Sequence, residues 1–422
     1  MSRFWHPFSN LAVTEGERLV LVRGDGATVE DDGGREYFDA TAGLWYSAVG
    51  HGNDRIAAAI GGQAATLESY SCFGVFATDV TLEVADRIAA AAPVADSRVF
   101  LTSGGSDSVD TAAKIARRHF ALRGLPEKTV MVAREHSYHG THAFGTSLGG
   151  ISGNREGWGT LVSDVAHVPP FDVGALEATI ESVGSERVAA FFVEPVIGAG
   201  GVYPPPEGYL RSVAEVCRRA GILLVCDEVV TGVGRLGSWS ASERYGVSPD
   251  LMILAKALTS GYQPLGAVVV SGEVAEPFLA GEGAMLKHGY TYSGHATACA
   301  AALANLDVIA EEGLIERAAR LAEGLPATLG GLADLDGVAE VRTVGFTAAI
   351  QLDEEQLAAA GVSGADVVAG CRERGQLTRL LSCGALHFSP PFVAEERQIE
   401  RFAEAVAETV DLRAPASAFG AG

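Results

Sequence analysis

The sequence predicts an α/β protein with a parallel sheet and a second, smaller α+β unit. Short apolar runs alternate with longer Ala- and Glu-rich segments of helical period, which is the pattern of buried strands joined by crossover helices. Beyond about residue 312 the order changes to helix, strand, helix, strand and helix. The chain has 422 residues, whereas a single core stops growing at ~250–300 residues. Two domains are therefore expected.

The elements are expected in a definite order along the chain. A small antiparallel meander comes first, because Gly- and Asp-rich turns separate the segments Leu19–Arg23, Thr28–Glu30 and Glu36–Asp39. Strands of the larger sheet are expected at Arg98–Thr102, Thr129–Ala133, Ala189–Glu194, Ile222–Cys226, Leu251–Leu254 and Leu265–Val270. Helices are expected at Asp107–Leu122, Tyr209–Ala220 and His295–Glu311. The second unit should contain one strand at Val338–Leu352 and another at Ala385–Phe388, and we expect a disordered tail after Leu412.

The composition argues against several classes of protein. A net charge of -22, from 53 acidic and 31 basic residues, would repel nucleic-acid backbones and anionic lipid headgroups. The chain lacks both an apolar stretch of ~20 residues and a cationic start followed by an apolar run, so we expect a cytoplasmic protein with no membrane partner. The six cysteines show no CxxC spacing, which argues against a disulfide framework and a zinc site.

A glycine-rich turn between a strand and a helix is the first candidate site. Thr102–Asp107 ends a predicted strand and opens the next helix. Its glycines allow close backbone approach, and the unpaired N–H groups at the positive end of a helix suit a phosphate. The same pattern also occurs in turns that bind nothing. It matches neither the Walker loop nor the dinucleotide fingerprint, whose residue spacings differ.

Two charged residues follow later apolar runs. Asp227 ends one such run, at the edge of a parallel sheet where α/β proteins bind ligands. A metal-binding or helix-capping carboxylate is the alternative for this residue. Lys256 is embedded in apolar sequence, although most lysines are solvated. A buried ammonium is costly unless its pKa falls, and a lysine with a depressed pKa is a nucleophile toward aldehydes.

An aromatic residue completes the set. Tyr138, in Tyr138–His139–Gly140 after a predicted strand, can stack on a planar cofactor, although a lone tyrosine is more often part of a core. A phosphate cup, a stacking ring, a strand-end Asp227 and a buried Lys256, in this chain order, indicate pyridoxal 5'-phosphate (PLP). Lys256 would bind the cofactor aldehyde and later move a proton as a base. Asp227 would keep the pyridine nitrogen protonated.

The chain resembles the class III PLP aminotransferases of the ω-amino acid:pyruvate type over nearly its whole length. One departure is Ser106–Asp107, where the family usually has Ser-Glu. The matching blocks are Phe4–Phe8, Gly43–Trp45, Gly50–Gly52, Tyr138–Gly140, Glu194–Gly201, Asp227–Arg235, Lys256 and Thr291–His295.

The resemblance implies a fold and a cofactor site. The fold would be that of PLP-dependent transferases of fold type I, with a mainly parallel seven-stranded sheet in a large domain (51–311) and a smaller α+β domain formed by 1–50 and 312–422. Thr291 would reach the phosphate of the neighbouring subunit's cofactor, so a homodimer with shared active sites is implied, and association into a tetramer stays open. In the site itself, the resemblance places Gly105 and Ser106 at the phosphate, Tyr138 and Val229 on the two ring faces, and Glu194 of the Glu-Pro motif beside the cofactor.

The residues that would select a substrate depart from some branches of the family. The ornithine and γ-aminobutyrate branches place a carboxylate-binding Arg where this chain has His387. The pyruvate-using branch carries a mobile Arg further upstream, for which Arg379 is the candidate. Its spacing to Pro390 is one residue longer than expected for that branch, and a surface role is the alternative. Trp45 and Tyr138, with Phe73 or Phe76 from the facing subunit, would line an aromatic amine pocket.

We therefore predict transfer of an amino group from a primary amine or ω-amino acid to pyruvate or another 2-oxo acid. One alternative is the biotin-pathway aminotransferase that uses S-adenosylmethionine, but its usual Trp-Trp is Leu44–Trp45 here. Another is a PLP aminomutase or racemase on the same fold, which would share Lys256 and Asp227. A non-catalytic binding protein would not need Lys256.

Overall fold

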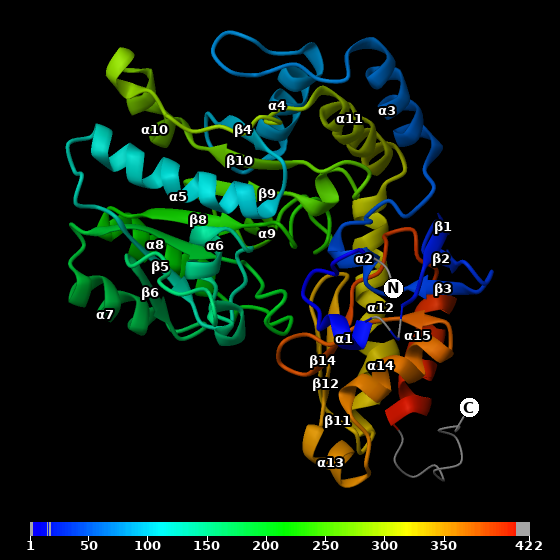
Figure 1. Cartoon of the computed structure of the whole chain (residues 1–422). Helices are drawn as coiled ribbons and strands as arrows, with labels where there is room; N and C mark the ends of the chain where they lie inside the picture. Colours follow the sequence, from blue (N-terminus) through cyan, green and yellow to red (C-terminus); the bar gives the residue numbers. More distant parts are fainter. Residues whose placement is uncertain (1–2, 15, 17, 411–422) are drawn as a thin grey trace.

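The computed structural model describes residues 3–14, 16 and 18–410, and its centre is a seven-stranded sheet (Figure 1). Within this sheet β10 runs opposite to the other strands, so the mainly parallel sheet predicted from the sequence is confirmed. In spatial order the strands are β4 (Arg98–Thr102), β10 (Gly266–Val270), β9 (Leu251–Leu254), β8 (Leu223–Asp227), β7 (Val188–Val193), β5 (Val130–Arg134) and β6 (Val165–Val168).

Helices cover both faces of this sheet (Figure 1). On one face Val109 and Phe120 of α5 pack with Met131, Phe192 and other strand residues. The opposite face packs against α7 and α8. Because both faces are covered, the central strands are continuously apolar, which explains why the sequence shows them as short apolar runs. The helices of this part are α3 (Asp54–Leu67), α4 (Asp79–Ala91), α5 (Gly105–Leu122), α6 (Ala143–Leu148), α7 (Val173–Val183), α8 (Tyr209–Ala220), α9 (Ala241–Arg244), α10 (Gly272–Ala275) and α11 (Ala296–Glu311).

The smaller part of the molecule holds two further sheets. The N-terminal meander forms as predicted and pairs with a short C-terminal strand, giving the order β1-β2-β3-β13. The second sheet is β11-β12-β14. The strands are β1 (Leu21–Asp25), β2 (Thr28–Asp31), β3 (Glu36–Asp39), β11 (Val338–Thr343), β12 (Ala348–Leu352), β13 (Gln376–Leu377) and β14 (Ala385–Phe388). The accompanying helices are α1 (Leu11–Thr14), α2 (Ala42–Trp45), α12 (Leu314–Gly330), α13 (Glu354–Ala359), α14 (Gly364–Glu373) and α15 (Glu396–Val410).

Two predictions about strands were incomplete. The single strand predicted at Val338–Leu352 is wrong, because this segment is the antiparallel hairpin β11–β12. Its turn contains Gly345 at φ +52°, a conformation that ends a strand and that glycine adopts without cost. The strand β6 was not predicted, since it lies at the sheet edge and three of its four residues are only partly buried. The predicted disordered tail after Leu412 lies outside the described residues.

The topology brings several loops to one place. The strands β4, β5, β7, β8 and β9 all run in the same direction, so their carboxyl ends share one edge of the sheet. Ligands of α/β proteins bind at such an edge. None of the helices in the described part of the chain combines the length and the apolarity that crossing a bilayer requires.

Candidate active site

A cleft of ≈ 480 Å³ opens at the carboxyl edge of the large sheet. Each loop that follows β4, β5, β7, β8 and β9 contributes to its wall. The cleft brings together all but one of the predicted cofactor residues: Gly105, Ser106, Tyr138, Glu194, Asp227, Val229 and Lys256. The exception is Thr291, which is exposed and does not line this cleft.

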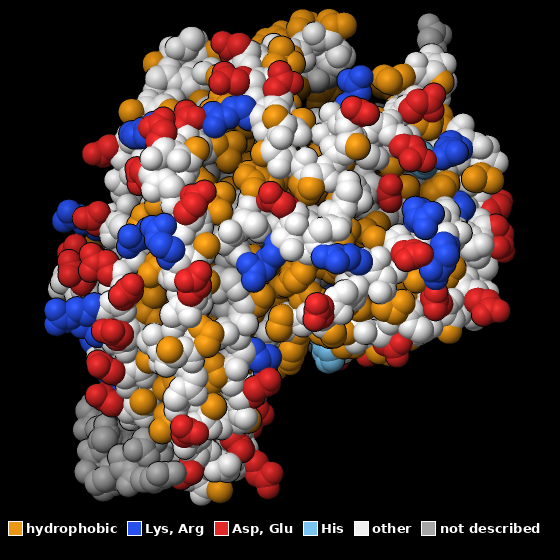
Figure 2. Space-filling view, turned by 180° about the vertical axis from the view of Figure 1, so that it is seen from behind, with side chains coloured by type: hydrophobic (Ala, Val, Ile, Leu, Met, Phe, Trp, Pro, Cys, Tyr) orange, Lys and Arg blue, Asp and Glu red, His pale blue; other side chains and the backbone are white. Residues whose placement is uncertain are grey.

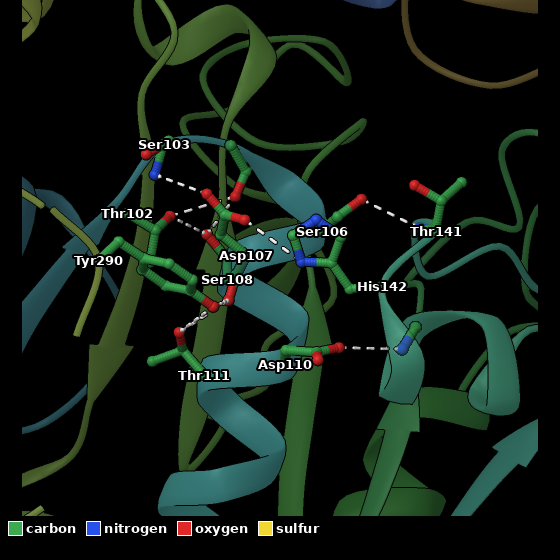
Figure 3. Close-up of polar contacts among 12 residues, drawn as sticks. Thr102, Ser103, Ser106, Asp107, Ser108, Asp110, Thr111, Thr141, His142 and Tyr290 are labelled. Carbon is green, nitrogen blue, oxygen red and sulfur yellow. Dashed lines mark hydrogen bonds and ion pairs between the residues drawn. The ribbon is translucent and has the colours of Figure 1, made fainter. Parts of the chain in front are cut away.

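One end of the cleft is formed by the start of α5 (Figure 3). The first N–H groups of a helix have no intrahelical acceptor. Because α5 begins at Gly105, these N–H groups lie at this end of the cleft. The hydroxyl oxygen of Ser106 accepts a hydrogen bond from the Thr141 N–H at 3.0 Å, so its own O–H can be donated to another group. Asp107 folds back and accepts from the Ser103 N–H at 3.1 Å, which fixes the turn before the helix.

The segment after Tyr138 is tied to the same helix (Figure 3). His142 Nδ1 lies 3.3 Å from Asp107 Oδ1. One turn further along α5, the Asp110 carboxylate accepts from the N–H groups of Phe144 and Gly145, at 3.1 Å and 3.2 Å. Burial raises the pKa of Asp110 and the two N–H donors oppose this effect. These contacts fix the backbone that carries Tyr138 relative to the start of α5.

Asp227 is held from two sides. Its Oδ2 lies 2.8 Å from His139 Nδ1, and its Oδ1 accepts from the Val229 N–H at 3.1 Å. An ionised carboxylate only accepts hydrogen bonds, so His139 Nδ1 carries the hydrogen. His139 is fully buried, and its Nε2 has no hydrogen-bond partner among the described residues. No role was predicted for His139, although it stands between Tyr138 and Gly140 directly after a predicted strand.

Glu194 supports the backbone beneath Tyr138. Its two carboxylate oxygens accept from the N–H groups of Tyr138 at 2.9 Å and Gly198 at 3.0 Å. Burial raises the pKa of Glu194, while nearby His139 and the two N–H donors lower it. The carboxylate thus joins the loop after β5 to the loop after β7.

Lys256 follows β9 and is partly exposed to the cleft. Its backbone adopts φ +46°, which is rare for a residue other than glycine, and such strained residues concentrate at functional sites. Desolvation lowers the pKa of Lys256 to about 8, the negative charges of Asp227 and Glu194 oppose the shift, and Arg379 adds to it. A larger fraction of this amine is therefore unprotonated near neutral pH than in an exposed lysine.

The substrate residues predicted from the sequence divide into two groups. Trp45 and Arg379 lie together beside Lys256, since the Arg379 guanidinium carbon is 4.6 Å and the Lys256 Nζ 5.7 Å from the Trp45 ring centroid. Phe73 and Phe76 are 52% and 53% exposed and, like Trp45 and Arg379, are not among the residues that line the cleft. Their predicted contribution to the facing subunit's site stays a prediction.

Residues 11–410 match the sequence pattern of the aminotransferase class-III family. The chain belongs to this family. The β-alanine–pyruvate aminotransferase of Pseudomonas aeruginosa is 36% identical, over 96% of this chain and 95% of that protein. A solved (S)-enantioselective omega-transaminase of Thermomicrobium roseum is 37% identical with a TM-score of 0.92, covering 97% of this chain and 96% of that one. An amine transaminase of an uncultivated Pseudomonas species, solved in its PLP-bound form, is 36% identical with a TM-score of 0.92, covering 98% of this chain and 99% of that one.

A class-III aminotransferase depends on PLP, and this cleft fits the cofactor. The start of α5 and Ser106 offer hydrogen-bond donors for a phosphate. Asp227, which is buried, offers a carboxylate for a protonated ring nitrogen, and Lys256 offers an amine for the aldehyde. The fold-type-I assignment is confirmed by the same relatives. The chain is thus a PLP-dependent aminotransferase, and the relatives favour this activity over the mutase, racemase and non-catalytic alternatives.

Proposed function

We propose that this aminotransferase moves an amino group from a primary amine or ω-amino acid to pyruvate or another 2-oxo acid by a ping-pong mechanism. The observation that carries the proposal is the position of Arg379, a partly buried guanidinium that shares the aromatic face of Trp45 with Lys256. A site with both features can hold an apolar amine in one half-reaction and a carboxylate in the other. The names of the relatives support this substrate class over S-adenosylmethionine.

Four residues would hold the cofactor. Gly105 and Ser106 would bind its phosphate through N–H and O–H donors. Tyr138 and Val229 would enclose the ring. A side chain at position 105 would be crowded, because a Cβ added there would lie 3.1 Å from Val229 Cγ1. Glycine at position 105 therefore lets Val229 keep its place beside the start of α5.

Asp227 and Lys256 would carry the chemistry. When bound, PLP supplies a ring that accepts the electron pair of the substrate's Cα–H bond. Asp227, which is held by its contacts with His139 and the Val229 N–H, would hold the proton on the ring nitrogen. The Lys256 amine would bind the aldehyde and, once displaced by the substrate amine, accept the Cα proton and return it in the next step.

Arg379 would bind the carboxylate of the 2-oxo acid. Desolvation lowers the pKa of Arg379 from its ordinary value of 12.5, and Tyr138 opposes this shift. A guanidinium in such a site stays charged and can pair with a carboxylate through two parallel hydrogen bonds. Apolar amines, which lack a carboxylate, would bind against the aromatic rings instead.

We also propose a homodimer with shared active sites, in the cytoplasm. A cluster of exposed apolar side chains supports the dimer, because monomers rarely expose such patches. Apolar side chains are visible at the top of the molecule in Figure 2, where the loop between α3 and α4 lies in Figure 1. The six cysteines are all free, in keeping with a reducing compartment. The exposed residues are Tyr70, Phe73, Val75, Phe76, Leu82, Met285 and Tyr292.

A complementation experiment tests the shared sites. A Lys256→Ala subunit mixed in equal amount with a Thr291→Asp subunit should regain about one quarter of the wild-type activity after random exchange, because half of the dimers are then mixed and each mixed dimer has one intact site of two. Each variant alone should be inactive. If the mixture also stays inactive although mixed dimers form, each site is contained in one subunit and the proposal is wrong.

The visible spectrum of the PLP-loaded protein tests the reaction itself. Addition of (S)-1-phenylethylamine without an acceptor should abolish the absorption band of lysine-bound PLP, and pyruvate should restore it. A band that forms but does not respond to any amine or ω-amino acid would contradict the proposed substrates while leaving the cofactor site intact. The Lys256→Ala variant is the control, since it should bind PLP without this band.

A further inference from the structure

Trp45 is the centre of a cluster that joins distant parts of the chain. Its ring centroid lies 4.1 Å from that of His387, with an angle of 41° between the planes. The Arg379 guanidinium carbon lies 4.6 Å from the same indole. His387 and Arg379 are themselves neighbours, because the His387 N–H donates to the Arg379 carbonyl at 2.9 Å. One indole thus contacts two residues of a single C-terminal hairpin.

The backbone of Trp45 is strained in order to reach this position. Trp45 adopts φ +64° and Ala42 φ +45°, both in the left-handed region that side chains disfavour. Neighbouring polar contacts hold the segment: Asp39 Oδ2 accepts from the Gly43 N–H at 2.7 Å, and the Thr41 hydroxyl donates to the Gly43 carbonyl at 2.9 Å. Strain of this kind persists where surrounding structure fixes it, often at ligand clamps.

His387 is the neutral member of the cluster. Burial lowers the pKa of His387 well below its ordinary value, and Arg379, Arg235 and Lys256 lower it further. A positive charge at this position would repel Arg379, whereas a neutral imidazole can share the indole with it. His387 is completely buried, and neither of its ring nitrogens has a hydrogen-bond partner among the described residues. Its imidazole ring packs against the Trp45 indole instead.

Arg379 keeps its hydrogen-bonding capacity. No side chain in the described part of the chain accepts a hydrogen bond from its guanidinium, and its Nε is buried without a partner. The contact with the Trp45 ring is a cation–π interaction, which orients a guanidinium without using its N–H donors. These donors stay available for a substrate carboxylate.

We propose that Trp45 is the platform that directs Arg379 toward the cleft, and that His387 fixes this platform. The two residues would then set the enzyme's preference between carbonyl acceptors that carry a carboxylate and acceptors that lack one. Trp45 and His387 act here as positioning residues, through Arg379. The inference rests on the proposed function, since it assigns Arg379 to the acceptor's carboxylate.

The test compares pyruvate with butanal as acceptors for one amine donor. Replacing Trp45 by Leu should raise the KM for pyruvate about tenfold more than it raises the KM for butanal, as expected for loss of a partly desolvated cation–π contact. Trp45→Phe, which keeps a ring, should change the KM for pyruvate less, and His387→Val should raise it by about threefold. Trp158→Leu is the matched control, because Trp158 is 71% exposed and should affect neither acceptor.

A double-mutant comparison connects the effect to Arg379. In an Arg379→Leu background, Trp45→Leu should no longer change the KM for pyruvate. Equal effects of Trp45→Leu on both acceptors, or an undiminished effect in that background, would overturn the inference in favour of a packing role. If the wild type does not use pyruvate, the proposed function fails separately. Inhibition by propionate, a carboxylate without a carbonyl, then still measures whether Trp45→Leu weakens carboxylate binding.

Discussion

The lowered pKa of Lys256 predicts how the apoprotein takes up PLP at different pH values. Only the unprotonated amine attacks the aldehyde, so the rate should rise with pH through the pKa. With a pKa of about 8, instead of 10.5, the unprotonated fraction at about pH 7.5 is 1/(1 + 10^0.5), about one quarter, against 1/(1 + 10^3), about one thousandth. Lys256 should therefore react about 200-fold faster than an exposed lysine under these conditions.

Three variants test the origin of this shift. Stopped-flow mixing of apoprotein with PLP, between about pH 6 and about pH 10, gives the midpoint of the rate profile. Asp227 and Glu194 raise the pKa of Lys256 and Arg379 lowers it. Asp227→Asn and Glu194→Gln should thus move the midpoint to lower pH, and Arg379→Met should move it to higher pH. A wild-type midpoint near that of free lysine, or shifts in the same direction for all three variants, would refute this reasoning.

Other parts of the structure give further predictions. Gly140→Ala should weaken PLP binding at least about tenfold, because the new Cβ would lie 2.9 Å from Ser106 Cα at φ +86°. Gly124→Ala is its control, since it has the same kind of φ but no atom within 4 Å of the new Cβ, and equal loss of PLP by both variants in equilibrium dialysis would contradict the clash. Lys128→Met should lower the free energy of unfolding by about 1–3 kcal/mol, because the buried ammonium donates to three backbone carbonyls. Urea denaturation measures this change, and an unchanged stability would show that water replaces the contacts. Gly62→Ala, within α3 with no atom within 4 Å of the new Cβ, should stabilise the protein by about 0.5–1 kcal/mol in the same assay, and a loss of stability there would indicate a contact with another subunit.

Most strands of the large sheet could be predicted because each is marked by a continuous apolar run within its own sequence. Strands covered on both faces are apolar along their whole length, so β7 and β8 stand out in the sequence. The edge strand β6 lacks this signal. The hairpin turn around Gly345 lies between apolar residues, and the sequence therefore resembles one continuous strand.

The site residues that could be predicted are those whose chemistry is evident from the residue type and its neighbours in the sequence. Asp227 and Lys256 follow apolar runs, and the shared edge of a parallel sheet brings them together. The pairing of His139 with Asp227 depends on which strands are neighbours in space. The contact between Trp45 and His387 joins residues that are far apart in the sequence, and no pattern of spacing indicates it. The surface role considered for Arg379 disagrees with its position beside Trp45.

The pairing of β3 with β13 has a consequence for biosynthesis. Domains fold progressively as the chain leaves the ribosome, N-terminal segments first. The meander emerges early, but its fourth strand, two residues before Arg379, is made only after the whole large sheet. Trp45 therefore lacks its contacts with His387 and Arg379 while the large sheet is being made. The segments around Lys256 can assemble earlier in synthesis than the site around Arg379, because they are made first.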